Sequence, residues 1–444
     1  MKLHSSNLRK VAVHYEASCL GNTAEWLTMK LPSSPVSAVL RHVAVIIRHG
    51  DRSPSLNPFV DVDAARRSTT SWIARAASEN EALNSRFPPW RLNPMEPLLD
   101  SVQWPWGSVT TLGLQQCYAR GREVASHYNR LVSSVRMPSD VIVRSSSYTR
   151  TRLSAQAFLD GLALPDSAGV IPVRIGATSN CNIAPFDADI GLREASRPIF
   201  DGAAMAALER KAVNLACCAA EVAPCFVSSD GGRSSKFLWI RIAELFVARA
   251  VWRDPPLTRE LCSAGPAVFS HLARRFALLF SDELALCLAA GGLLTDIADH
   301  AVTASSSSNG PKLSIVCGHD VTLLALVYSL MIESRGIRTL SQRRAAQLDV
   351  SLQSEAETGV VPWPSHAATL SLEVYGCGAP DGGACRVSEA ANVARLHTSR
   401  VVWRYFTEHC TQGGLMGVIE LPRLQKLAVR LLRRKLDYTG RKSH

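Results

Sequence analysis

The sequence predicts an α/β protein, because a buried strand followed by a polar loop recurs along the chain. Three such strands, rich in β-branched and apolar residues, are predicted at 43–47, 141–143 and 313–317. The second and third loops lead directly into apolar helices, as in α/β folds. The 444 residues are enough for a large core and suggest two or three domains. The contents of 47% hydrophobic and 20% charged residues are typical of a soluble globular protein.

The first predicted strand ends in a loop, residues 48–54, that concentrates reactive side chains. A sheet fixes such a loop and can hold reactive groups in place. Arg48 and Arg52 offer planar forks of N–H donors that suit a phosphate. His49 lies between them and is a candidate nucleophile, since imidazole forms covalent intermediates. Gly50 allows the backbone to come close to a ligand. A charged surface turn would explain the same residues if nothing else in the chain pointed to a site.

The second and third loops carry further candidates. Arg150 lies at the start of an apolar helix expected to run from about residue 153 to 162. The helix dipole disfavours a cation there, so a bound anion nearby would explain this arginine. His319 and Asp320 follow the third strand and precede an apolar helix that extends to about residue 332. The His-Asp pair alone is common by chance, and its position at a strand end gives it weight.

The remaining chain is predicted by pattern. Residues 55–105 are broken by several prolines, and one short helix is expected there at 72–79. Thr110 or Thr111 is expected to cap a helix that runs to about residue 129. Most of residues 200–300 is predicted to be helical, as an insertion, with helices at 203–220, 238–251 and 268–290. Further strands are expected within 364–375 and at 401–405. The apolar segment 276–294 is interrupted by two acids, which favours a buried helix pair over a membrane span.

Charge and composition narrow the kinds of partner. The net charge of +11 is compatible with nucleic acid, acidic lipid or anionic substrates. Arginines are scattered and no nucleic-acid-binding motif stands out, so a phosphorylated substrate is favoured and nucleic acid is not expected. In the last helix, leucines share one side with neighbouring cations: Leu424, Leu427, Leu431, Leu432, Arg430, Arg433, Arg434 and Lys435. Such a helix can touch membrane lipid, but packing on its own domain is favoured.

None of the 12 cysteines forms a paired C-x-x-C zinc pattern, and no ligand cluster indicates a metal or another cofactor. Cys117, Cys287 and Cys317 fall in apolar segments and are expected to be buried thiols. Cys377 and Cys385 flank a Gly/Pro/Asp loop and could form a disulfide in an oxidising compartment. The amino terminus lacks the apolar core of a secretory signal, which favours an intracellular location, cytoplasmic or organellar. The oligomeric state cannot be predicted.

The loop at residues 48–54 closely resembles the RHGxRxP signature of the histidine acid phosphatases, a branch of the phosphoglycerate mutase-like superfamily. The helix at Gly113 and Gln116 resembles the LTxxGxxQ helix of this family, and residues 144–156 resemble its RSxxxxRT segment with the following SAQ. Residues 291–297 are similar to a GxLLxxI helix start. The His319-Asp320 pair matches the second signature. The residues around both signatures look somewhat like the lysophosphatidic acid phosphatase subgroup.

The resemblance implies a fold: a six- or seven-stranded mixed sheet flanked by helices in three layers, with a smaller all-helical cap domain over the carboxyl ends of the strands. We therefore expect an amino-terminal tail at 1–37 and an α/β domain built from 38–170 and 300–444. The cap is expected at 171–299, with an insertion at 55–105 near the site.

The resemblance also implies a mechanism. His49 would attack phosphorus and form a phosphohistidine, while Asp320 would protonate the leaving oxygen and later activate water. Arg48, Arg52, Arg150 and His319 would bind the phosphate of a small phosphorylated substrate, such as a lysophospholipid phosphate, without a metal. An acidic pH optimum is expected because Asp320 must carry a proton. Alternatives are an inactive phosphate-binding regulatory protein of this fold, a phosphoglycerate mutase-like phosphotransferase and a nucleic-acid-binding protein.

Overall fold

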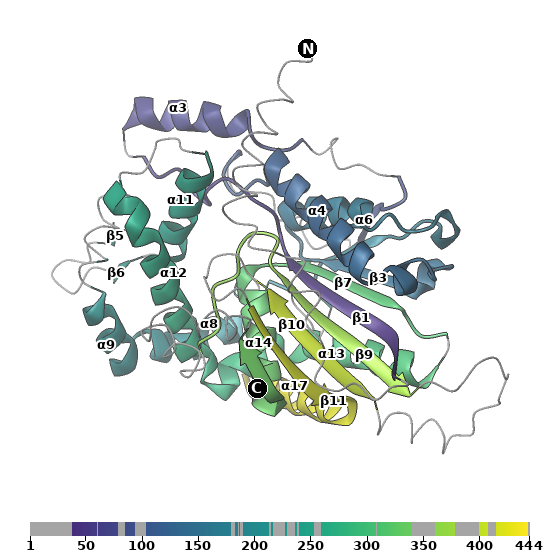
Figure 1. The fold of residues 1–444 in the computed structure, drawn as a ribbon. Coiled ribbons are helices and arrows are strands. Elements are labelled where there is room, and N and C mark those ends of the chain that lie inside the picture. Colours follow the sequence, from purple (N-terminus) through teal and green to yellow (C-terminus); the bar gives the residue numbers. More distant parts are fainter. Residues whose placement is uncertain are drawn as a thin grey trace, which may run out of the picture.

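A computed structural model describes most of the chain around one central sheet (Figure 1). The described residues are 38–59, 61–78, 85–93, 104–178, 183–184, 186, 190–212, 215, 227–228, 236–237, 239–252, 259–307, 309–339, 360–377, 399–406 and 414–442. The predicted tail at 1–37 and Cys385 of the predicted disulfide lie outside them.

The central sheet is mixed and has nine strands in the described part of the chain, in the order β2-β4-β3-β7-β1-β9-β10-β11-β8. In this order their bounds are Pro89–Arg91, Val173–Ile175, Val141–Ser145, Leu313–Gly318, Ala38–Arg48, Thr369–Cys377, Arg400–Phe406, Gly414–Glu420 and Arg335–Thr339. The strands from β2 to β1 pair in parallel, whereas those from β1 to β8 pair antiparallel. The prediction of a mixed sheet is confirmed. The sheet has more strands than the six or seven expected.

The alternating directions of the side chains along β1 show why the fold has three layers. Val43, Val45 and Ile47 join one core cluster with the helices on one face, whereas Ala44 and Ile46 join a second cluster on the other. Successive residues of a strand point to opposite faces, so a strand that is apolar at every position must be covered on both. Helices on the first face are α4 (Thr111–His127), α5 (Asn129–Val132) and α6 (Thr149–Leu162), with short 3₁₀ turns at Pro138–Asp140 and Asp166–Ala168.

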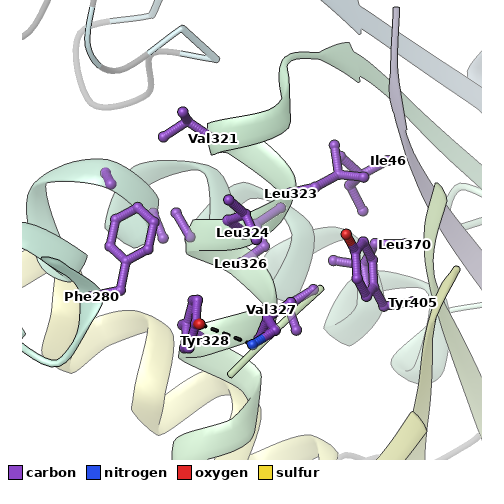
Figure 2. Packing of buried hydrophobic residues seen from close by; sticks show 14 of the residues in the cluster. Ile46, Phe280, Val321, Leu323, Leu324, Leu326, Val327, Tyr328, Leu370 and Tyr405 are labelled. Atoms are coloured by element: carbon purple, nitrogen blue, oxygen red, sulfur yellow. Dashed lines mark hydrogen bonds between the residues drawn. The ribbon is translucent and has the colours of Figure 1, made fainter. Parts of the chain in front are cut away.

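The second face is covered by α13 (Glu283–Ser306), α14 (Asp320–Glu333) and α17 (Leu421–Lys442). Figure 2 shows α14 side chains, among them Leu323 and Val327, next to Ile46 of β1, Leu370 of β9 and Tyr405 of β10. The same apolar cluster continues into the mainly helical part of the chain, which lies beside the sheet in Figure 1. Its helices are α8 (Ile190–Phe200), α9 (Ala203–Lys211), α11 (Trp239–Trp252) and α12 (Arg259–Phe280).

Several predicted elements need correction. A two-stranded sheet, β5 (Val227–Ser228) with β6 (Lys236–Phe237), means that the helical part is not all-helical. The helix expected at 268–290 is two helices, α12 and α13, because Asp282 caps α13 by accepting from the Ala285 amide at 2.8 Å. This confirms the buried helix pair. Helix α13 continues through residue 299, so a domain boundary there would cut a helix. Strand β4 pairs within the central sheet although it lies in the range 171–299 expected for the cap.

Two further differences concern helix starts. In the proline-rich segment the helix is α3 (Val62–Ile73), not 72–79, since Asp61 caps it. The start expected at Gly291 lies inside α13, where a Cβ at this glycine would stand 3.1 Å from the α17 backbone, so the glycine allows two helices to pack closely. Thr110 caps α4 as predicted, accepting from the Gly113 amide.

The final helix and the thiols agree with the predictions. Helix α17 buries Leu424, Leu427 and Leu431 in the core cluster shared with α13, which confirms packing on its own domain. The predicted thiols at 117, 287 and 317 are buried and free. One described helix, α13, is long and apolar enough to cross a membrane, which the sequence analysis did not foresee. Because 72% of its apolar window is buried, it has the character of a core helix.

Candidate active site

Three parallel strands bring the predicted site residues to one edge of the sheet. Ile47 of β1 is in register with Cys317 of β7, and Cys317 is in register with Ser145 of β3. All three strands therefore end at the same level, and the residues that follow them meet. The loop after β1 begins with His49, and His319 caps α14 directly after β7. Helix α6, just beyond β3, carries Arg150 in its first turn.

The contacts confirm that these residues form one cluster. The rings of His49 and His319 lie 5.5 Å apart in an edge-on arrangement. Arg48 Nη2 pairs with Asp320 Oδ2 at 2.9 Å, and Arg150 Nη2 lies 3.5 Å from His319 Nδ1. Arg52 completes the set, because its positive charge lowers the pKa of both histidines. All six predicted residues therefore lie close together.

The surroundings of His49 fix its protonation. Nδ1 lies 2.9 Å from the carbonyl oxygen of Gly50, which can only accept, so Nδ1 carries the hydrogen and Nε2 keeps its lone pair. The ring is buried, at 2% exposure. Burial, together with the charges of Arg150, Arg48 and Arg52, holds its pKa well below the usual value. His49 is thus a neutral imidazole with one unprotonated nitrogen.

His319 is held in a similar environment. Burial and the charges of Arg150, Arg52 and Arg48 hold its pKa well below the ordinary value. Its Nε2 lies 3.0 Å from Ser146 Oγ. Its backbone N–H donates to Thr322 Oγ1 at 3.1 Å, and its side chain accepts from the backbone N–H of Thr322. The first turn of α14 therefore holds both the backbone and the ring of His319. Since the Arg150 guanidinium can only donate, Nδ1 is the acceptor and the one ring hydrogen of a neutral His319 lies on Nε2, which faces Ser146 Oγ; an anion in the cluster would compete with that hydroxyl for it.

Two arginines keep one N–H group without a protein acceptor. Arg48 donates through Nη1 to Pro364 O at 2.6 Å and pairs through Nη2 with Asp320. Arg52 donates through Nη1 to Ser53 O at 2.8 Å and through Nη2 to Glu244. The Nε of each is buried, with no hydrogen-bond acceptor among the described residues. Leaving buried donors unpaired costs free energy, so these two groups are suited to an anion with several oxygens.

The structure adds residues that the sequence analysis did not assign to the site. Asp51 is fully buried and accepts hydrogen bonds from Thr110 Oγ1 at 2.7 Å and from Trp252 Nε1 at 3.0 Å. Its Oδ1 lies 3.5 Å from Nδ1 of His366, whose ring is 5.7 Å from that of His49. Burial raises the pKa of Asp51 to about 6. The residue stood in the signature loop, but no sequence signal indicated its partners.

The structure shows a packing requirement for glycine at position 50. A Cβ at this position would stand 2.0 Å from the carbonyl oxygen of Gly113. The backbone of the loop therefore packs directly on α4, which only a residue without a Cβ allows. Gly113 meets the same limit from the other side, since its Cβ would stand 2.2 Å from Asp51 O. This pair explains why both glycines stand in the motifs quoted above.

Among the described residues, no three His, Cys, Asp or Glu side chains are grouped as a metal site would need. The chemistry proposed below uses only this chain's own side chains.

Comparisons with known proteins agree with this geometry. A profile of the histidine phosphatase superfamily (branch 2) matches residues 39–187, which include the first signature. The chain is 23% identical over 389 residues to the lysosomal acid phosphatase of Xenopus laevis, and the match covers 79% of each protein. It is 25% identical over 142 residues to the prostatic acid phosphatase of Homo sapiens, which covers 32% of this chain and 28% of that protein.

Solved structures share the fold. The Hafnia alvei phytase in complex with myo-inositol hexakis sulphate aligns with a TM-score of 0.52 at 15% identity, over 89% of this chain and 98% of that one. The phytase of Klebsiella sp. ASR1 aligns with a TM-score of 0.50 at 15% identity, over 91% and 96%.

The sheet, the paired histidines and the arginines around them, together with these similarities, support a phosphatase of the histidine type. Over residues 39–187 the chain is similar to the histidine phosphatase superfamily (branch 2), and both relatives named above are acid phosphatases.

Proposed function

We propose that the protein hydrolyses phosphate monoesters through a phosphohistidine on His49. The observation that carries this proposal is the tautomer of that ring, which leaves a lone pair on Nε2 inside a cluster of guanidinium groups. Phosphoryl transfer needs an in-line nucleophile and stabilisation of charge on the equatorial oxygens. Arg48, Arg52 and Arg150 would supply that stabilisation, with His319 as a further donor.

The reaction would take place in two steps. His49 Nε2 forms a bond to phosphorus while the bond to the ester oxygen breaks, and protonated Asp320 gives its proton to the leaving alkoxide. The Asp320 carboxylate then takes a proton from water, the resulting hydroxide attacks phosphorus, and the nitrogen–phosphorus bond breaks to release inorganic phosphate. Without substrate, Asp320 pairs with Arg48 at 2.9 Å. Since the first step requires a protonated Asp320, we expect activity to be highest at acidic pH.

The substrate beyond a phosphate monoester remains open to experiment. The sequence favours a lysophospholipid phosphate, whereas the structural relatives named above are phytases. A substrate panel at several pH values should therefore include a lysophosphatidate, inositol hexakisphosphate and a nitrophenyl phosphate.

The panel also tests the alternative, an inactive phosphate-binding protein of the same fold. Wild type should release phosphate from at least one ester, and His49→Ala should release none while still binding inorganic phosphate. Phosphate binding without turnover of any ester by the wild type would support the inactive alternative and refute the proposal.

A further inference from the structure

Helix α11 of the mainly helical part contacts the loop after β1 at two points. Glu244 accepts a hydrogen bond from Arg52 Nη2, and Trp252 donates from Nε1 to Asp51 Oδ2 at 3.0 Å. The two residues are eight positions apart, so they share one side of the helix. The loop residue Ser55 adds two hydrogen bonds to Glu244, from its backbone N–H at 3.2 Å and its hydroxyl at 2.7 Å. One helix therefore holds a segment that precedes it by about 190 residues.

The ion pair between Glu244 and Arg52 is buried. Their side chains are 11% and 7% exposed. Burial alone would raise the pKa of Glu244, but the charge of Arg52 and the Ser55 hydrogen bonds outweigh it and leave the pKa below its usual value. Glu244 is therefore ionised in the folded protein. Its three acceptor contacts fix the carboxylate, as a buried charge requires.

Glu244 decides which N–H group of Arg52 remains available. With Nη1 bonded to Ser53 O and Nη2 to Glu244, the buried Nε is the group with no acceptor among the described residues. A guanidinium is planar, so hydrogen bonds from Nη1 and Nη2 together fix the direction of the Nε–H bond. A carboxylate at Nη2 thus orients Arg52 for an anion that approaches from the Nε side.

We propose that Glu244 is a positioning residue for phosphate binding, through which helix α11 holds Arg52 in the orientation that presents Nε–H to the substrate. The proposal rests on the proposed function, because it takes Arg52 as a phosphate-binding residue. The opposite role is that the carboxylate competes with phosphate for Arg52. Positioning predicts weaker phosphate binding when the carboxylate is moved, whereas competition predicts tighter binding.

Two substitutions separate these roles. Glu244→Asp keeps the charge but withdraws the carboxylate by one carbon–carbon bond. Glu244→Gln keeps the reach and an acceptor for Arg52, but it removes the charge and places an NH2 group against the Ser55 N–H. Glu244→Asp should raise KM for a phosphomonoester and Kd for inorganic phosphate about tenfold, the effect of one hydrogen bond to a charged group, with a smaller change in kcat. Glu244→Gln should weaken phosphate binding less than Glu244→Asp does, because its oxygen can still accept from Arg52 at the same reach.

Glu209 supplies a matched control within the helical part. It accepts from Trp239 Nε1 at 2.8 Å and pairs with Arg275, so Glu209→Gln disturbs a carboxylate network of the same part of the chain. This variant should leave KM and Kd unchanged. Binding is measured by the rise in Tm with inorganic phosphate, which needs no turnover.

Each outcome decides the proposal. Weaker binding in Glu244→Asp with a normal Glu209→Gln supports positioning, even if no ester is turned over. Unchanged or tighter phosphate binding in Glu244→Asp overturns it, and so does an equal loss in Glu209→Gln. If the wild type hydrolyses esters while Glu244→Asp behaves like it, the positioning role fails and the proposed function stands. If wild type neither binds phosphate nor turns over an ester, both fail.

Discussion

The buried carboxylate of Asp51 makes the stability of this protein depend on pH in an unusual direction. Its pKa rises from 3.8 to about 6 on folding, because burial disfavours the charged form more than its hydrogen bonds and Arg52 favour it. Between these two pH values the folded state binds more protons at this site than the unfolded state. The contribution of Asp51 to the free energy of unfolding is therefore largest below pH 3.8 and declines as the pH rises through 6.

The size of this effect follows from the shift. A difference of roughly 2 pKa units corresponds to about 3 kcal/mol, because each unit is worth about 1.4 kcal/mol. Asp51→Asn removes the titration while keeping an oxygen that can accept from Thr110 or Trp252. The free energy of unfolding of the variant, minus that of wild type, should therefore increase by about 3 kcal/mol between pH 4 and pH 7.

Urea unfolding at several pH values, with two-state behaviour verified, measures this difference. Asp166→Asn, at a side chain that is fully exposed, controls for the loss of one negative charge. A difference between Asp51→Asn and wild type that stays constant from pH 4 to pH 7 would refute the assignment of Asp51 as a carboxylate destabilised by burial.

Two further changes test the packing that supports the site. Gly50→Ala forces a methyl group against a carbonyl oxygen of α4 and should lower the free energy of unfolding by about 1–3 kcal/mol or more. The control Gly440→Ala, whose added methyl group meets no atom within 4 Å, should cost no stability. Equal stabilities of the two variants would contradict the close packing of loop and helix. Glu373→Ala removes the buried partner of Arg404, 2.7 Å away, and should lower the free energy of unfolding by about 3–5 kcal/mol. The control Asp63→Ala, at an exposed ion pair, should change it little. Thermal and urea unfolding measure both variants, and a small loss for Glu373→Ala would show that Arg404 does not depend on this partner.

The elements that the sequence predicted well are those whose signal is local. Residues 43–47, before His49, are apolar at every position, and a polar loop follows them, so both the strand and its end could be inferred. The same holds for the strand before His319 and the helix after Arg150. The prediction that the six residues share one site came from the resemblance, and the structure shows how they meet, because these strands are parallel neighbours.

What the sequence did not predict depends on contacts between distant segments. Glu244 lies in an amphipathic helix and looks like any solvated carboxylate there, and only the fold places it against Arg52. His366 precedes β9 in an irregular segment, and its position beside Asp51 results from the pairing of β9 with β1. Strands β2 and β4 have only three residues each and carry little periodicity, which explains the underestimated width of the sheet.

The central claim is that His49 becomes phosphorylated during turnover, and direct trapping tests it. In Asp320→Asn, a substrate with a good leaving group such as nitrophenyl phosphate needs no proton donor in the first step, while hydrolysis of the intermediate loses its base. Rapid quenching with labelled substrate should therefore accumulate an acid-labile, base-stable phosphoryl group on His49, and none in His49→Ala. Label on another residue, or turnover by His49→Ala at the wild-type rate, would contradict the account.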